Sequence, residues 1–278
     1  MQVELAKCAG SCYGVQRALD MALNAAEGPR QVQTLGPLIH NPQVVARLEE
    51  RGASVAKTPE DIHAQSVVIR SHGVTPQVRA AVEAKGVEIL DATCPHVLRA
   101  QRAASDLARK CGTVLVVGER SHPEVEALCT WAEAAGAKAI TVSSEEELPT
   151  ECSEPVGIVV QTTQRRAVLD EVLSHLHSRG IAFELRDTIC EATHDRQLAA
   201  EELSRRVDAM VVIGGRNSSN TTRLYEICAA AAPLAFHVET AEELRPRDFE
   251  GLRSVGVTAG ASTPEDLIQS VVSLLESW

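Results

Sequence analysis

The sequence contains few aromatic residues and no long hydrophobic run. Aromatic side chains make up 3% of the 278 residues, so valine, leucine, isoleucine and alanine must fill the core that the 44% hydrophobic content can build. No run approaches the roughly 18–20 apolar residues that cross a bilayer, and residues 1–5 lack the basic and apolar stretch typical of a signal peptide. We therefore expect a soluble, cytoplasmic protein with no membrane partner.

The chain also lacks an excess of positive charge. Its 27 basic and 38 acidic residues give a net charge of −11. This balance argues against a general nucleic-acid-binding protein, because such a protein needs a basic face. It does not argue against a small anionic ligand, because histidines and helix N-termini create locally positive sites.

The eight cysteines form no C-x2-C pair, which argues against a structural zinc site. No secretory signal accompanies them, so we do not expect a disulfide framework. Five of them lie in apolar or ordinary helical contexts, and we interpret these as small buried hydrophobic residues. They are Cys8, Cys111, Cys129, Cys152 and Cys228.

The other three cysteines, Cys12, Cys94 and Cys190, divide the chain into near-equal thirds, with separations of 82 and 96 residues. Each lies in a short loop between an apolar, strand-like run and a helix-like run. This spacing indicates three copies of one unit, each delivering a thiolate to a shared centre. Three thiolates are one fewer than the usual set for a cubane iron–sulfur cluster. The pattern therefore suggests a cluster with one open, Lewis-acidic iron, and hence an enzyme.

Short runs of valine, isoleucine and leucine alternate with segments of helical period along the chain. Continuous apolar strands between helices are typical of parallel sheets covered on both faces, so we expect an α/β fold of three similar units. The expected units are residues 12–93, 94–189 and 190–278, and residues 1–11 are expected to add a strand to the third. The expected strands are residues 3–7, 32–35, 66–70, 113–117, 157–160, 210–213 and 254–257.

Polar loops follow these strands at matched distances from the three cysteines. A first polar residue lies 28 residues after each cysteine (His40, His122, Ser218), and a second lies 60 to 72 residues after it (His72, Thr162, Ser262). Ligands of parallel α/β sheets bind beyond the carboxyl ends of the strands. Three such units around a pseudo-threefold axis would therefore aim these loops at one central cavity.

The loop residues are of the types that a phosphate or diphosphate needs. The histidines offer N–H donors, while Ser218, Ser219 and Asn220 offer neutral donors where a helix begins. The loops lack the lysine of a Walker-type site. Glu124, two residues after His122, is suited to act as a general acid, with Thr162 relaying the proton or positioning the leaving oxygen.

Taken one at a time, these residues have simpler interpretations. Ser218 and its neighbours are also typical of an ordinary N-cap, and Pro123 with Glu124 is typical of plain helix initiation. We interpret the other histidines as helix-start, surface or core residues. The matched placement in all three thirds favours the functional interpretation.

Nine motifs in chain order carry a resemblance to a known family. They include Cys12-x-Gly14-Val15-x-Arg17-Ala18, Ser71-His72-Gly73-Val74, Asp91-Ala92-Thr93-Cys94-Pro95, His122-Pro123-Glu124-Val125, Gln161-Thr162-Thr163 and Asn217-Ser218-Ser219-Asn220. The chain resembles the 4-hydroxy-3-methylbut-2-enyl diphosphate reductases of the LytB family. These are the last enzymes of the methylerythritol phosphate route to isoprenoids.

The resemblance implies a trefoil of three α/β units around a [4Fe-4S] cluster that is held by three cysteines and keeps one open iron. It implies a two-electron reductive dehydroxylation in which the substrate hydroxyl binds that iron, yielding isopentenyl and dimethylallyl diphosphate. Electrons would come from a ferredoxin or flavodoxin, because nothing in the sequence resembles a flavin or nicotinamide site.

The same resemblance assigns roles to individual residues. Cys12, Cys94 and Cys190 match the cluster ligands, and Glu124 matches the proton donor, with Thr162 beside it at the substrate hydroxyl. The diphosphate site matches His40, His72, His122, Ser218, Ser219, Asn220 and Ser262. The chain departs from the family beside the site, at Ser11 and Ala127 among others, which affects pocket shape and reductant docking more than the reaction.

Two other functions stay open. One is a cluster-dependent dehydratase or reductase that acts on another anionic alcohol. The other is an iron–sulfur redox sensor, which needs no carboxylate or phosphate donors around its metal. His72, Glu124 and Asn220 argue against the sensor.

Overall fold

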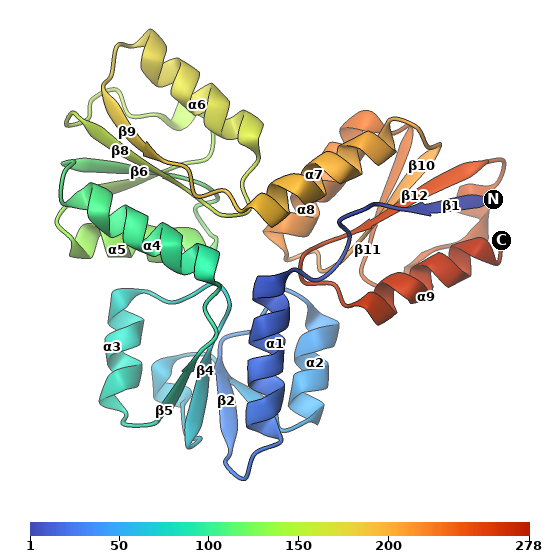
Figure 1. Cartoon of the computed structure of the whole chain (residues 1–278), viewed down its shortest axis with the longest axis horizontal. Coiled ribbons are helices and arrows are strands. Elements are labelled where there is room, and N and C mark those ends of the chain that lie inside the picture. The colour runs from blue at the N-terminus through green and yellow to red at the C-terminus, as the bar shows by residue number, and fades with distance from the viewer. The chain divides into compact units, whose positions relative to one another are not determined.

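Three four-stranded parallel sheets organise the protein, and the computed structural model describes all of its residues, 1–278 (Figure 1). The strands are β1 (Gln2–Leu5), β2 (Val32–Leu35), β3 (Ala53–Ala56), β4 (Ser66–Ile69), β5 (Glu88–Asp91), β6 (Thr113–Val117), β7 (Lys138–Val142), β8 (Val156–Val160), β9 (Phe183–Arg186), β10 (Ala209–Ile213), β11 (Leu234–Val238) and β12 (Ser254–Ala259). The helices are α1 (Tyr13–Ala26), α2 (Pro42–Glu50), α3 (Pro76–Ala84), α4 (Pro95–Ala108), α5 (Pro123–Ala134), α6 (Arg166–Ser178), α7 (Glu191–Ser204), α8 (Ser219–Ala231) and α9 (Glu265–Glu276). None of these helices combines the length and apolar character that crossing a membrane requires.

The three sheets share one strand order. They read β3-β2-β4-β5, β7-β6-β8-β9 and β11-β10-β12-β1. The N-terminal strand β1 pairs in parallel with β12, so it supplies the fourth strand of the last sheet. The structure therefore confirms an α/β fold with three parallel-sheet units, while the residue boundaries of the three expected domains stay predictions.

The central strands are largely apolar because helices cover both of their faces. Every residue of β6, β8 and β10 is buried. In the sheet that contains β6, Leu115 and Val117 pack against α6, whereas Val114 and Val116 pack against α4 and α5. Alternate residues of one strand thus serve two separate apolar layers, as in other parallel sheets buried on both faces.

The sheet that contains β10 is built in the same way. Val211 and Ile213 pack with Ile268 and Val271 of α9, while Met210 and Val212 pack against α7 and α8. Figure 1 shows α9 on one side of this sheet and α7 and α8 on the other. Because helices pack on both faces of the sheet, the positions of the strand ends are fixed. The loops that follow the strands therefore begin at fixed positions.

The chain divides into two compact units. Unit 1 comprises Met1–Gln16, Ile39–Ala46 and Glu191–Trp278, and it contains the sheet β1-β12-β10-β11. Unit 2 comprises Arg17–Leu38 and Arg47–Cys190, and it contains the other two sheets. The site residues are described below within the unit that holds each of them.

The helical period of the sequence predicts a helix over residues 196–206, but α7 begins five residues earlier, at Glu191. Its first turns bury polar side chains, namely Thr193, Arg196 and Gln197. These residues give no hydrophobic period, so the sequence pattern missed the start of the helix. The difference places Cys190 directly before the first turn of α7.

Candidate functional site

Each of the three predicted cysteine ligands lies at the start of a helix. Cys12 directly precedes α1, Cys94 is the N-cap residue of α4, and Cys190 directly precedes α7. None of the three is part of a disulfide, and all three are partly buried. A helix N-terminus carries partial positive charge, so these positions favour a negatively charged ligand atom such as a thiolate sulfur.

The backbone of each cysteine is fixed by an equivalent hydrogen bond. The N–H of Cys94 donates to the carbonyl of Ser71, and that of Cys190 to the carbonyl of Thr162, both at 2.9 Å. In unit 1 the N–H of Cys12 donates to the carbonyl of Ala261 at 3.2 Å. The threefold repeat that the cysteine spacing indicated is therefore present in the backbone hydrogen bonds.

The three accepting carbonyls occupy the same position in three similar turns. Each turn is closed by a 3.0 Å hydrogen bond from the fourth residue to the first, in Arg70–Gly73, Gln161–Gln164 and Gly260–Thr263. Thr162 is therefore equivalent to Ser71 and Ala261. It lies one position earlier in its turn than His72 and Ser262 do in theirs, so grouping these three by distance along the chain was wrong by one residue.

A glycine directly follows the first central strand of each sheet. Gly36, Gly118 and Gly214 each donate a backbone hydrogen bond to the last residue of the neighbouring edge strand. A Cβ on Gly118 would lie 2.8 Å from the side-chain oxygen of Gln161, so only glycine lets these loops approach so closely. His40, His122 and Ser218 each lie four residues after their glycine, which explains their equal distance from the cysteines.

In unit 2, Glu124 and Thr162 form a buried pair. Glu124 is 1% exposed. Its Oε1 accepts the backbone N–H of Thr162 at 2.7 Å, and its Oε2 accepts the Thr162 hydroxyl at 2.9 Å. Since the carbonyl of Thr162 also accepts the N–H of Cys190, a single residue connects a predicted cluster ligand to the predicted proton donor.

Two predicted histidines lie beside each other in unit 2. The rings of His72 and His122 meet edge to face, with centroids 5.6 Å apart. His122 caps α5, and its Nδ1 accepts the backbone N–H of Glu124 at 3.1 Å. Because Nδ1 accepts this hydrogen bond, a neutral His122 ring carries its proton on Nε2.

In unit 1, the N-terminus of α8 presents the three adjacent polar residues that the sequence singled out. Ser218 caps the helix, and its hydroxyl oxygen accepts the N–H of Thr221. The Asn220 side chain is 5% exposed, and neither its oxygen nor its nitrogen has a hydrogen-bond partner. A buried amide without partners is costly unless a ligand satisfies it. The unpaired amide of Asn220 therefore makes this helix start a candidate ligand site.

Two hydrogen bonds within unit 1 join the loop of Ser262 to the loop of His40 and Asn41. The Ser262 hydroxyl donates to the His40 carbonyl at 3.2 Å, and the Asn41 amide donates to the Ser262 carbonyl at 3.0 Å. The side-chain oxygen of Asn41 also accepts the N–H of Val44 at the start of α2. Asn41 thus fixes both loops, a role that the sequence analysis did not assign to it.

Three more residues that the sequence analysis did not assign hold these loops. Gln161 accepts the backbone N–H of Glu119 at 2.9 Å, just before His122. Arg17 donates to the carbonyls of Asp91 and Thr93, which precede Cys94. Arg196, buried on α7, donates to the carbonyl of Gly10 at 2.8 Å, two residues before Cys12.

Electrostatics support the structural interpretation of three other cysteines. Burial raises the pKa of Cys228 to about 11, and burial also raises the pKa of Cys111 and of Cys129. These thiols therefore remain protonated and behave as small apolar side chains. Near Cys94, burial by itself would raise the pKa of Asp91, but hydrogen bonds from Thr93 and Arg79 outweigh it and hold that pKa below its usual value.

The predicted site residues are divided between the two units. Unit 2 contains Cys94, Cys190, His72, His122, Glu124 and Thr162, and unit 1 contains Cys12, His40, Ser218, Ser219, Asn220 and Ser262. Within each unit the predicted residues follow the carboxyl ends of the strands, as expected for a parallel sheet. The gathering of all three cysteines at one centre stays a prediction.

Known proteins resemble this chain along its whole length. The family model described as LytB protein matches residues 3–276. The 4-hydroxy-3-methylbut-2-enyl diphosphate reductase of Geobacter metallireducens is 46% identical over 275 residues, which are 98% of this chain and 96% of that protein. The enzyme of the same name from Aquifex aeolicus is 40% identical and covers 99% of this chain and 96% of its own length.

Two solved structures also resemble this chain. One described as (E)-4-hydroxy-3-methyl-but-2-enyl diphosphate reductase, the terminal enzyme of the non-mevalonate pathway, is 40% identical, covers both chains completely and has a TM-score of 0.73. The Plasmodium falciparum reductase structure is 24% identical, covers 99% of this chain and 87% of its own, and shares the fold with a TM-score of 0.91. The chain therefore belongs to the LytB protein family.

Proposed function

We propose that this protein removes the hydroxyl group of 4-hydroxy-3-methylbut-2-enyl diphosphate by two-electron reduction, giving isopentenyl and dimethylallyl diphosphate. The relatives that share 40–46% of its sequence over nearly the whole chain bear the name of that reductase. The observation that carries the proposal is the connection from Cys190 through Thr162 to Glu124. Through Thr162, this connection links the buried Glu124, which we propose as the proton donor, to a predicted cluster ligand.

The cysteines fit an iron–sulfur cluster. Cys12, Cys94 and Cys190 lie at helix N-termini outside any disulfide, and equivalent hydrogen bonds hold their backbones. We propose that these three residues hold a [4Fe-4S] cluster whose fourth iron has no protein ligand. When bound, such a cluster supplies electrons singly and a Lewis-acid site for an oxygen ligand. Free thiols and an exposed iron both suit a reducing compartment such as the cytoplasm.

Glu124 and Thr162 are proposed to deliver the proton that turns the leaving hydroxyl into water. In its protonated form Glu124 donates to the Thr162 hydroxyl, and that hydroxyl donates its own proton to the substrate oxygen. The backbone N–H of Thr162 holds the carboxyl group in place throughout. Burial excludes water that would otherwise compete for this proton.

The diphosphate is proposed to bind the polar donors of these loops, namely His40, His72, His122, Thr162, Ser218, Ser219, Asn220 and Ser262. The N-terminus of α8 adds a favourable dipole for an anion. The Ser262 hydroxyl, which donates to the His40 carbonyl, has to turn away from that carbonyl to donate to a phosphate oxygen.

Asn220→Ala is expected to weaken the binding of inorganic pyrophosphate about ten- to a hundredfold, since a hydrogen bond to a charged group contributes ~1.5–3 kcal/mol. The free energy of unfolding without ligand should not fall, because the substitution removes a buried amide that has no partner. Calorimetric titration with pyrophosphate and urea unfolding measure the two quantities. Asn24→Ala, at an exposed position of α1, is the matched control. Unchanged pyrophosphate affinity in Asn220→Ala would remove Asn220 from the site.

The proposed reaction is tested by anaerobic purification, iron and sulfide analysis, and turnover of the diphosphate substrate with reduced methyl viologen. We expect both isomeric products to form, and only when reductant is present. Turnover without reductant would instead indicate a dehydratase. Cluster-loaded protein that fails to convert the substrate would contradict the proposal.

A further inference from the structure

The proposed reaction needs electrons that this chain does not supply. One allylic C–O bond breaks, the oxygen leaves as water with one proton from the protein, and a C–H bond forms with a second proton. The reaction also consumes two electrons. A one-electron carrier therefore has to bind and transfer an electron twice in each turnover. A carrier protein therefore has to dock close to one of the three cysteines.

Unit 2 contains a cavity of about 600 Å³ that reaches the loop carrying Cys94. Helices α3, α4 and α5 line it, together with Asp91 and Thr93. Thr93 directly precedes Cys94, so the two Cα atoms are about 3.8 Å apart. The wall of the cavity is therefore one residue away from a predicted cluster ligand.

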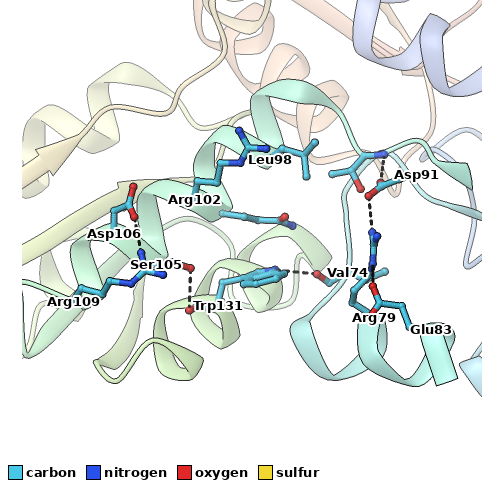
Figure 2. Close-up of a pocket in the computed structure, with 12 residues that line it drawn as sticks. Val74, Arg79, Glu83, Asp91, Leu98, Arg102, Ser105, Asp106, Arg109 and Trp131 are labelled. Carbon is cyan, nitrogen blue, oxygen red and sulfur yellow. Dashed lines mark hydrogen bonds and ion pairs between the residues drawn. The ribbon is translucent and has the colours of Figure 1, made fainter. Parts of the chain in front are cut away.

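The cavity has an apolar side and a charged rim. Figure 2 shows Leu98 and Arg102 extending from α4 on one side and Trp131 of α5 on the other. The indole N–H of Trp131 donates to the Val74 carbonyl at 3.2 Å, which fixes the ring. A rigid aromatic ring beside an open cavity is typical of the anchor points at protein interfaces.

The charges on α4 indicate the kind of partner. Arg99 and Arg102 are exposed, and neither forms an ion pair or a side-chain hydrogen bond. They lie three residues apart and so share one face of the helix. By contrast, Arg79 is paired with Glu83 and Asp91, and Arg109 with Asp106.

This positive face is particular to the helix at Cys94. Helix α4 carries two arginines and one aspartate, α1 carries one arginine and one aspartate, and α7 carries one arginine and four acidic residues. The protein as a whole has a net charge of −11 and repels acidic proteins. Among the three helices that begin at the cysteines, only α4 offers an acidic carrier a favourable approach.

We propose that an acidic one-electron carrier protein docks on unit 2 over this cavity, with Arg99 and Arg102 pairing with its carboxylates and Trp131 as the apolar contact. This inference rests on the proposed function. It names the side of the molecule, next to Cys94, at which electrons enter.

The test compares two reductants, a photoreduced acidic [2Fe-2S] ferredoxin and reduced methyl viologen, in the cluster-loaded enzyme. Arg102→Glu is expected to raise the KM for ferredoxin about tenfold, because charge pairing governs encounter and orientation. Turnover with methyl viologen should stay at the wild-type rate. Added salt should raise the wild-type KM for ferredoxin more than that of the variant.

Matched variants separate docking from general charge effects. Arg51→Glu changes the net charge equally at an exposed arginine without an ion-pair partner, and it should leave the KM for ferredoxin unchanged. Arg102→Lys should retain most of the wild-type affinity, because it keeps the charge. Equal KM values for wild type and Arg102→Glu, or an equal rise in Arg51→Glu, would overturn the proposal.

Direct binding of ferredoxin, measured by calorimetry, keeps the docking proposal separate from the reaction. If wild-type protein turns over with methyl viologen but Arg102→Glu binds ferredoxin as wild type does, docking at α4 is wrong and the proposed function stands. If wild-type protein converts no substrate, the proposed function fails, while a loss of ferredoxin binding in Arg102→Glu still supports the docking surface.

Discussion

Glu124→Gln is expected to assemble the cluster and bind the substrate but to lose about 10²- to 10⁴-fold in turnover, the usual contribution of a general acid. Glutamine has the shape of glutamate, and its side-chain oxygen still accepts the backbone N–H of Thr162. The glutamine side chain has no acidic proton, so it cannot reprotonate the Thr162 hydroxyl. The measurement is single-turnover product formation under anaerobic conditions with reduced methyl viologen.

Two controls make this result specific to the proton. Glu126→Gln changes an exposed carboxylate in the first turn of the same helix and should leave the rate unchanged. The visible spectrum and iron content of Glu124→Gln should equal those of the wild type. A wild-type rate in Glu124→Gln would show that the proton comes from elsewhere.

Cys94→Ser is expected to prevent assembly of an intact four-iron cluster and to abolish turnover. A serine hydroxyl is a poor replacement for a thiolate on iron, and the Cys94 position at the start of α4 offers no second sulfur ligand. Iron and sulfide analysis with electron paramagnetic resonance of the reduced protein would measure this. The free energy of unfolding of the cluster-free protein should change little, because Cys94 is only partly buried.

Cys152→Ser is the matched control, since Cys152 is also free and partly buried but is not a proposed ligand. It should keep a normal cluster and a normal rate. An unchanged cluster spectrum in Cys94→Ser would contradict the three-cysteine site, whatever the activity of the variant.

The local sequence pattern predicted the central strands but missed most of the edge strands. Both central strands of every sheet were predicted, because they are mostly buried on both faces and mostly apolar, although β2 contains the half-exposed Gln33. The five strands that were missed, β3, β5, β7, β9 and β11, all lie at sheet edges. Several of their residues are half-exposed and polar, as in the Phe183–Arg186 strand, so neither a continuous apolar run nor a clean alternation marks them.

The sequence pattern also could not identify the residues that fix the loops carrying the predicted site residues. Asn41 contacts Ser262, which is 221 residues away along the chain, and Arg196 contacts Gly10, which is 186 residues away. Judged from the neighbouring sequence alone, Asn41 is an ordinary helix cap and Arg196 an ordinary helix residue. Only the folded chain shows that their bonds fix the loops carrying predicted site residues.

The sequence by itself determined the fold class, the family and the set of residues proposed for chemistry. These are encoded in features that neighbouring residues carry, namely apolar runs, helix starts and motifs in a fixed order. The tertiary structure decided the pairing of Glu124 with Thr162, the partnerless amide of Asn220, the equivalence of the three turns and the cavity beside Thr93. Such features depend on contacts between distant segments, whose distances and burial no local pattern records.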